Sequence, residues 1–234
     1  MAEMNVRSVA FLALFAGTYA ALTILPGFRV VGLPSAEIDF VRGLEPVYGI
    51  MLGPIIGPGA AFLGAVVGKL IFGEISSIIF TPLALVSTLI AAFIYQRSFF
   101  RAPGWALSSA IMGALIIAWY LTPTGIQAPL YPIFHIFAMI GVLTLRGRLT
   151  TMLRSSVKKE VVLGMFICSF AATMAGNMLG NLVFIFLFNP SPLLFVGLLP
   201  ITLIERVIIS WIATGVGASL LISIKDKYFI KRSD

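Results

Sequence analysis

The side chains of this chain that could do chemistry are a few polar groups inside long apolar runs. Glu205 and Arg206 follow Pro200 in a run that stays apolar to about residue 224. Ionisable groups at membrane depth are costly, which makes them functional candidates by default. Adjacent helical side chains point about 100° apart, so at least one of the two should reach another helix, a loop or a ligand. An ion pair that locks two helices is the alternative.

Amide, imidazole and phenol groups accompany this pair. Thr173, Asn177 and Asn181 recur every fourth residue and share one face of a predicted helix, where amides bind a ligand or bridge to another helix. His135 is the only histidine, and without clustered Cys, Asp or Glu it is more typical of hydrogen-bonded packing than of a metal site. Tyr48 lies in a stretch rich in glycine and proline. The predicted substrate-binding residues are Tyr48, His135, Asn177, Asn181, Glu205 and Arg206.

Motifs for catalysis fail on spacing. The segment from Gly64 to Leu70 resembles a phosphate-binding loop, but it is one residue short and ends in Leu instead of Ser or Thr. No His-Glu-x-x-His pair is present, and one histidine leaves little room for a Ser/His hydrolase. We therefore expect no catalytic residue, no metal and no cofactor. If transport here uses ATP, another subunit must supply it.

The composition is that of a membrane protein. The 234 residues are 59% hydrophobic and 11% charged, with a mean hydropathy of +1.06, whereas soluble domains average about a quarter charged residues. The formal net charge of +7 is typical of the positive-inside bias, so we expect a lipid bilayer and no nucleic acid as partner. One cysteine excludes an intramolecular disulfide. These features predict an all-α polytopic membrane protein with a single transmembrane domain, residues 1–234.

The stretch from Gly43 to Gly73 organises the predicted bundle. As one straight helix it would be about 45 Å long, which exceeds a hydrocarbon core of about 30 Å. Glycines and prolines interrupt it at Gly53–Gly59, so we expect a Gly/Pro-broken helical hairpin over 43–73 that enters and leaves on one side. A single kinked helix is the alternative. Such interrupted segments often mark a transporter's binding site.

Six further helices are predicted, at 7–25, 76–96, 104–121, 130–145, 161–188 and 193–224, giving a bundle of about six to eight crossings. Basic clusters follow at 97–101, 146–159 and 225–232. They fall on one side only if 43–73 contributes an even number of crossings. We therefore expect a multi-pass protein of the cell membrane with both termini cytoplasmic and the loops 26–42 and 122–129 outside. Two full crossings and a re-entrant hairpin both satisfy this count. Most of the site candidates then map to the outer half, in a pocket capped by loop 26–42.

The first predicted helix carries small residues on one face, at Ala13, Ala16, Gly17 and Ala20. A smooth face of this kind lets another helix approach closely. It predicts either a partner-docking surface or packing within this chain.

Together these features resemble the substrate-binding (S) components of energy-coupling factor transporters. The similar segments are the small-residue face of the first helix, loop 26–42, Leu44-Glu45-Pro46-Val47-Tyr48-Gly49 with the following Leu52-Gly53-Pro54, Gly57 to Gly68, and Leu199-Pro200-x-Thr202-Leu203-Ile204-Glu205-Arg206. The resemblance implies a vitamin-type micronutrient bound from outside. It also implies that the Ala16-x-x-x-Ala20 face docks on a transmembrane coupling subunit attached to two ATPases. Three other functions stay open: a stand-alone secondary transporter with Glu205 as coupling carboxylate, an intramembrane enzyme using His135 with Glu205, and a structural assembly protein.

Overall fold

The computed structural model describes residues 6–230, apart from the side chains of Arg7, Pro34, Ser35 and 225–230. Its helices are α1 (Val6–Leu22), α2 (Leu44–Ile71), α3 (Leu83–Tyr95), α4 (Gly104–Tyr120), α5 (Pro123–Gln127), α6 (Ile133–Leu145), α7 (Gly147–Leu153), α8 (Lys158–Phe188) and α9 (Pro192–Ile230). Two 3₁₀ turns, η1 (Phe40–Gly43) and η2 (Ile75–Phe80), flank α2. The strands form two small antiparallel pairs, β1 (Gly27–Val30) with β2 (Leu33–Asp39), and β3 (Ser98–Phe99) with β4 (Ala102–Pro103).

The fold is that of an all-α membrane protein. Within residues 6–230, four segments are long and apolar enough to cross a bilayer: Phe40–Ile71, Ile75–Tyr95, Lys158–Phe188 and Pro192–Ile224. The pair α6 and α7, bent by 86°, would make a fifth. The helices α1 and α4 have 17 residues each, about 26 Å at 1.5 Å per residue, slightly less than a hydrocarbon core. The predicted bundle of six to eight crossings therefore stays a prediction.

Helix α2 folds back on itself at Gly53, where the backbone angles are φ 77° and ψ −176°. This region is essentially restricted to glycine. A Cβ placed on Gly57 would lie 2.8 Å from the Tyr48 carbonyl oxygen, although residues nine apart in a straight helix are separated by about 13.5 Å along its axis. Segments 44–52 and 54–71 are therefore two arms of a hairpin. The break is narrower than the expected Gly53–Gly59, because Pro54 begins the second arm, where a helix needs no N–H donor.

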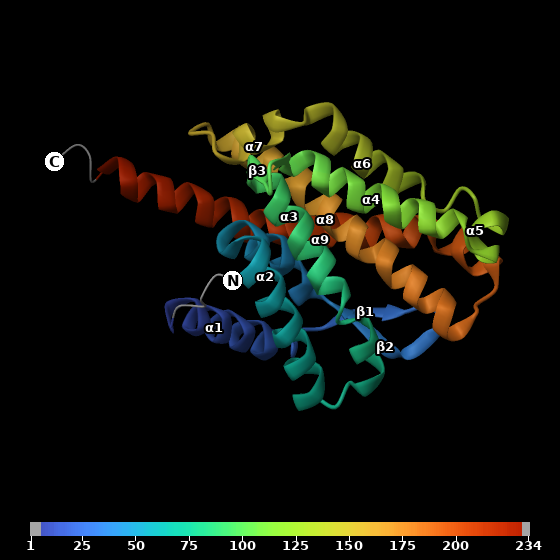
Figure 1. The fold of residues 1–234 in the computed structure, drawn as a ribbon. Helices are drawn as coiled ribbons and strands as arrows, with labels where there is room; N and C mark the ends of the chain where they lie inside the picture. The colour runs from blue at the N-terminus through green and yellow to red at the C-terminus, as the bar shows by residue number, and fades with distance from the viewer. Residues whose placement is uncertain (1–5, 231–234) are drawn as a thin grey trace.

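Glycines bring α2 into close contact with both of its neighbours. A Cβ on Gly49 would lie 2.1 Å from the Thr88 carbonyl oxygen of α3, and one on Gly64 would lie 2.7 Å from the Ala16 carbonyl oxygen of α1. Membrane helices associate through such contacts because lipid offers no hydrophobic drive between them. Figure 1 shows α1 at the edge of the molecule beside α2, while α8 and α9 run through its middle.

The β1–β2 hairpin occupies the segment expected to be a loop over 26–42. Arg29 faces Glu37 in its register, and the turn includes Gly32 with φ +90°. A Cβ on Gly32 would lie 3.2 Å from Phe184 and 3.4 Å from Leu194. The tip of the hairpin thus rests on the end of α8 and the start of α9.

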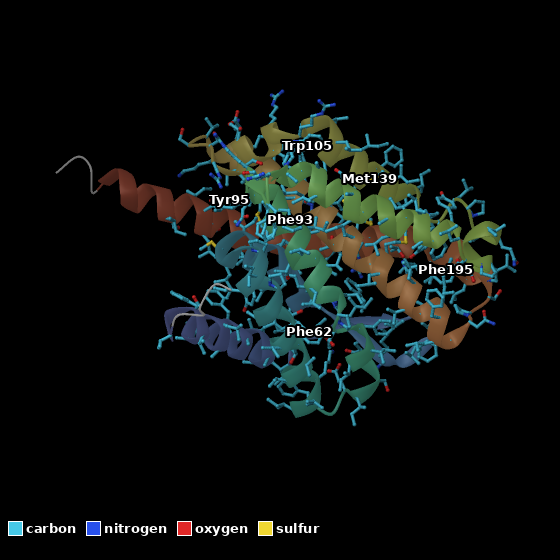
Figure 2. The ribbon with its side chains drawn as sticks, in the orientation of Figure 1. Phe62, Phe93, Tyr95, Trp105, Met139 and Phe195 are labelled. Atoms are coloured by element: carbon cyan, nitrogen blue, oxygen red, sulfur yellow. The ribbon has the colours of Figure 1, made fainter. Side chains whose placement is uncertain are left out.

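The two ends of the bundle differ in chemistry. At one end the Arg154 guanidinium donates to the Tyr95 carbonyl oxygen at 3.0 Å, and that of Arg146 lies 5.4 Å from the Trp105 ring centroid. Figure 2 shows Tyr95 and Trp105 far from Phe195, which marks the end with the β1–β2 hairpin. The basic clusters 97–101 and 146–159 thus share one end, and α9 projects beyond the bundle there (Figure 1). Part of the third cluster, 231–232, lies outside the described residues.

Candidate functional site

A cavity lies beneath the β1–β2 hairpin, between α8 and α9. The hairpin contributes Arg29, Val30, Val31 and Ile38 to its wall. The helices and connecting segments contribute Phe80, Leu83, Tyr131, Asn177, Gly180, Asn181, Phe184, Phe195, Leu198, Ile201, Thr202, Glu205 and Arg206. The centre of a water molecule can occupy about 60 Å³ of it, and its space including the open mouth is about 630 Å³. The first value is well below the about 300–1,000 Å³ of typical small-molecule pockets, so a ligand of that size requires the hairpin to move.

The cavity brings together four of the predicted site residues, Asn177, Asn181, Glu205 and Arg206. Asn177 and Asn181 lie one turn apart on α8, with the Asn181 Nδ2 donating to the Asn177 Oδ1 at 3.1 Å. The same oxygen lies 3.0 Å from the His135 Nε2. With the amide oriented this way, Nε2 carries the hydrogen. His135 is therefore attached to the site through Asn177 from behind the cavity wall.

Glu205 and Arg206 form a buried ion pair on α9. The Arg206 Nη2 donates to the Glu205 Oε2 at 3.3 Å, and the two residues are 3% and 9% exposed respectively. Adjacent helical residues were not expected to pair face to face. The structure corrects this expectation, because the long arginine side chain folds back onto its neighbour. The Arg206 Nε is buried and has no hydrogen-bond partner among the described residues.

Tyr131 and Thr202 are polar residues of the cavity that were not predicted to belong to the site. Tyr131 lies near a helix end, where an aromatic residue is usually interfacial, but it is 3% exposed. Its hydroxyl accepts from the Asn181 Nδ2 at 2.9 Å and lies 3.3 Å from the Thr202 Oγ1. The sequence spacing could have indicated both residues. Tyr131 lies four residues before His135, and Thr202 lies four residues before Arg206, so on a helix each would share a face with a predicted site residue.

Tyr48 lies apart from the cavity. Its hydroxyl donates to the Phe15 carbonyl oxygen at 2.9 Å, and its ring meets those of Phe15 and Tyr19 edge-on at 5.1 and 6.0 Å. This contact joins α1 to the first arm of α2. Its assignment to substrate binding therefore stays a prediction without a contact to support it.

A second buried polar cluster lies between α1, η1 and α2. The Arg42 Nη1 is 3.4 Å from the Glu45 Oε1, which also accepts from the Tyr19 hydroxyl at 3.0 Å. The Arg42 Nη2 donates to the Phe80 carbonyl oxygen at 3.0 Å. Arg42 was placed in the first loop from the sequence, where an exposed side chain is the default. Here its charge is matched by Glu45, and the cluster fixes η1 and η2 beside the cavity.

An ion-pair cluster tethers the hairpin to the end of α2. The Lys69 Nζ donates to the Asp39 Oδ1 at 2.6 Å and also contacts the Glu74 carboxylate. Lys69 is 2% exposed and Asp39 3%. Burial raises the pKa of the Asp39 carboxyl above its usual value, although the Lys69 ammonium opposes this. The Glu37 N–H also donates to the Ser77 Oγ at 3.1 Å. We call Asp39, Lys69 and Glu74 the hairpin anchor.

Part of the small-residue face of α1 packs within the chain, and part of it is exposed. Ala16 contacts Gly64 through its backbone, and Ala20 is 4% exposed, so both pack within the chain. Ala13 and Gly17 are exposed, and a Cβ on Gly17 would meet nothing within 4 Å. The surface left for a partner is therefore narrower than predicted and centres on Ala13 and Gly17.

The polar side chains of the cavity do not form a metal site in the part of the chain that the structure describes. Among residues 6–230, no group of three or more His, Cys, Asp or Glu side chains could hold a metal ion. The arrangement offers hydrogen bonds and one ion pair to a ligand beside an apolar wall. The cavity thus combines polar groups with an apolar wall inside a bundle of long apolar helices.

Comparison with known proteins gives one distant relative. No protein-family model matches the chain. An uncharacterized protein of Methanocaldococcus jannaschii is 28% identical to it over 224 residues, which cover 92% of this chain and 70% of that protein. No solved structure matches significantly. The relative's name states no activity.

Proposed function

We propose that this chain is the substrate-capture subunit of a membrane transporter, in which the β1–β2 hairpin closes over a small water-soluble molecule. The observation that carries the proposal is the cavity beneath the hairpin. A strand pair and two long apolar helices together line one space, and its buried wall carries amides and an ion pair. Such groups at membrane depth are typical of substrate pathways.

For a ligand to enter, the hairpin would move as a cap. It is attached to the helices through the hairpin anchor, the Glu37–Ser77 hydrogen bond and apolar contacts of Val30, Leu33 and the buried Ala36. Its tip rests on Phe184 and Leu194 through side-chain contacts. A ligand could enter when these contacts separate, while α8 and α9 keep their positions.

The proposal extends to partners through the resemblance to energy-coupling factor S components. The vitamin-type substrate, the transmembrane coupling subunit and the two ATPases belong to the proposal, as do the cytoplasmic termini. The clustering of two basic segments at the end opposite the hairpin supports this sidedness. The exposed Ala13 and Gly17 on α1 are the proposed docking surface.

The first test is purification of the tagged full chain from its native membranes, with identification of co-purifying proteins and small molecules. We expect two ATPase subunits, a second membrane subunit and a retained polar small molecule. Accumulation of substrate by the chain alone in proteoliposomes, driven by a pH gradient, would overturn the subunit proposal in favour of a secondary transporter.

A matched pair of variants tests the docking surface. Gly17→Leu should reduce recovery of the complex, because a bulky side chain prevents close helix approach. Gly215→Leu on α9 is the control, since a Cβ there also meets nothing within 4 Å. Both variants should retain the small molecule. Equal recovery of partners with both variants would remove Gly17 from the docking surface.

A further inference from the structure

We infer that the cavity recognises a zwitterion, an α-amino acid with an apolar side chain, through Arg206 and Glu205. The inference rests on the proposed capture function and deepens it, with an amino acid as substrate in place of the vitamin-type micronutrient that the resemblance implies. The carboxylate of such a ligand would accept from Arg206, its ammonium would donate to Glu205, and its side chain would lie against the apolar wall.

The charged end of the cavity offers both signs side by side. Arg206 is 3% exposed, lines the cavity, and keeps its buried Nε without a partner in the described part of the chain. Arg206 pairs at 3.3 Å with Glu205, which also lines the cavity. Guanidinium groups bind carboxylates through two parallel hydrogen bonds. A ligand carboxylate can therefore use donors that the protein leaves unused.

Charge balance favours a ligand that is neutral overall. Arg206 is matched by Glu205, and the neighbouring Arg42 is matched by Glu45 at 3.4 Å. The cavity's other cation, Arg29, has a side chain that is 79% exposed and faces Glu37, so it adds little buried charge. A singly charged ligand would therefore bring an uncompensated charge into a low-dielectric site, which is strongly unfavourable. A zwitterion brings one charge for each protein partner.

The rest of the wall suits an apolar side chain. Phe80, Phe184, Phe195, Leu83 and Leu198 line the cavity. The Phe195 ring lies 5.1 Å from that of Tyr131 and 6.4 Å from that of Phe184, edge-to-face in both pairs. These rings and aliphatic side chains offer apolar contacts, and an added aromatic ring could pack edge-to-face against them.

The test measures binding to the purified full chain in detergent. Native mass spectrometry with a mixture of the twenty standard amino acids first identifies which are retained, and calorimetry then compares L-phenylalanine with two close analogues. L-Phenylalanine amide lacks the carboxylate, and 3-phenylpropionate lacks the ammonium. We expect each analogue to bind at least about tenfold more weakly, because each brings a single uncompensated charge into the buried site.

Two variants assign the charges. Arg206→Gln should abolish the preference for L-phenylalanine over its amide, and Glu205→Gln should abolish the preference over 3-phenylpropionate. Arg148→Gln, at an exposed arginine in the basic cluster at the opposite end of the bundle, is the control and should leave both preferences unchanged. The comparison of ligands on the unmodified chain stands even where a variant fails to fold.

Different results would overturn the amino-acid ligand and the capture function. Retention of an anion or a cation, with no zwitterion bound at about 1 mM, overturns the ligand class and leaves the capture function standing. If neither an amino acid nor a molecule retained from native membranes binds, the capture function itself is overturned.

Discussion

Replacing Lys69 by methionine should destabilise the protein strongly at neutral pH and much less at pH 5. The substitution keeps the apolar stem of the side chain and removes the ammonium of the hairpin anchor. Asp39, whose side chain is 4% exposed, then loses the cation that it contacts at 2.6 Å. Glu74, at 29% exposure, can turn towards water. The loss therefore falls mainly on Asp39.

The magnitude follows from two independent limits. Removing one partner of a buried ion pair costs about 3–5 kcal/mol. Alternatively, Asp39 can be protonated. Protonating a carboxylate with a usual pKa of about 3.9 costs about 1.36 kcal/mol for each pH unit above that pKa. Protonation of Asp39 therefore costs at most about 4 kcal/mol at pH 7 and about 1.5 kcal/mol at pH 5. Because burial already raises the pKa of Asp39, and loss of Lys69 raises it further, the folded variant binds more protons than its unfolded chain. Its stability relative to wild type therefore increases as the pH falls.

Equilibrium unfolding by SDS in mixed micelles, followed by far-UV circular dichroism at pH 7 and pH 5, measures these differences. Arg29→Met is the matched control on the same hairpin: its ion pair with Glu37 is exposed, at 79% and 36%, so its removal should cost less than about 1 kcal/mol at either pH. Adding Asp39→Asn to Lys69→Met should recover much of the loss. A loss below about 1 kcal/mol at pH 7, or an equal loss at both pH values, would refute the reasoning.

Three further predictions concern the α2 turn, the helix packing and the cavity. Gly53→Ala should lose about 1–3 kcal/mol of unfolding free energy because φ is 77°, whereas Gly17→Ala on open helix surface should be neutral or slightly stabilising in the same assay. Gly49→Ala should lower the melting temperature more than Gly53→Ala does, since its Cβ would lie 2.1 Å from a carbonyl oxygen of α3; equal melting temperatures would contradict the close packing. Asn181→Ala should weaken binding of the retained ligand by up to about tenfold in calorimetry, and unchanged affinity would exclude Asn181 from ligand contact.

Much of the cavity could be predicted because its residues follow local rules. Asn177 and Asn181 share a face by their spacing of four, and Glu205 and Arg206 stand out as charges inside an apolar run. Tyr131 was missed because an aromatic residue at a helix end is usually interfacial. Its burial depends on Asn181, fifty residues later, and on Thr202.

The remaining features depend on contacts that no sequence spacing records. The direction of Tyr48 towards α1 is set by how α1 crosses α2, and Lys69 reaches Asp39 only after the second arm of α2 returns to the hairpin end. The division of the α1 face has the same origin, because Gly64 fixes which alanines turn inward. Likewise, a helix of 17 residues such as α1 or α4 leaves the number of crossings undetermined by length.

The fold-back of α2 constrains the order of biogenesis. Its first arm, 44–52, is about 14 Å long, too short to span a hydrocarbon core, and it carries the buried Glu45. A translocon would not release such a segment into lipid on its own, because its backbone end and its carboxylate would lack partners there. The partners of the arm are α1, already synthesised, and α3, still to come. Integration of this hairpin should therefore wait until α3 has left the ribosome, so that the three elements enter the bilayer as one assembled unit.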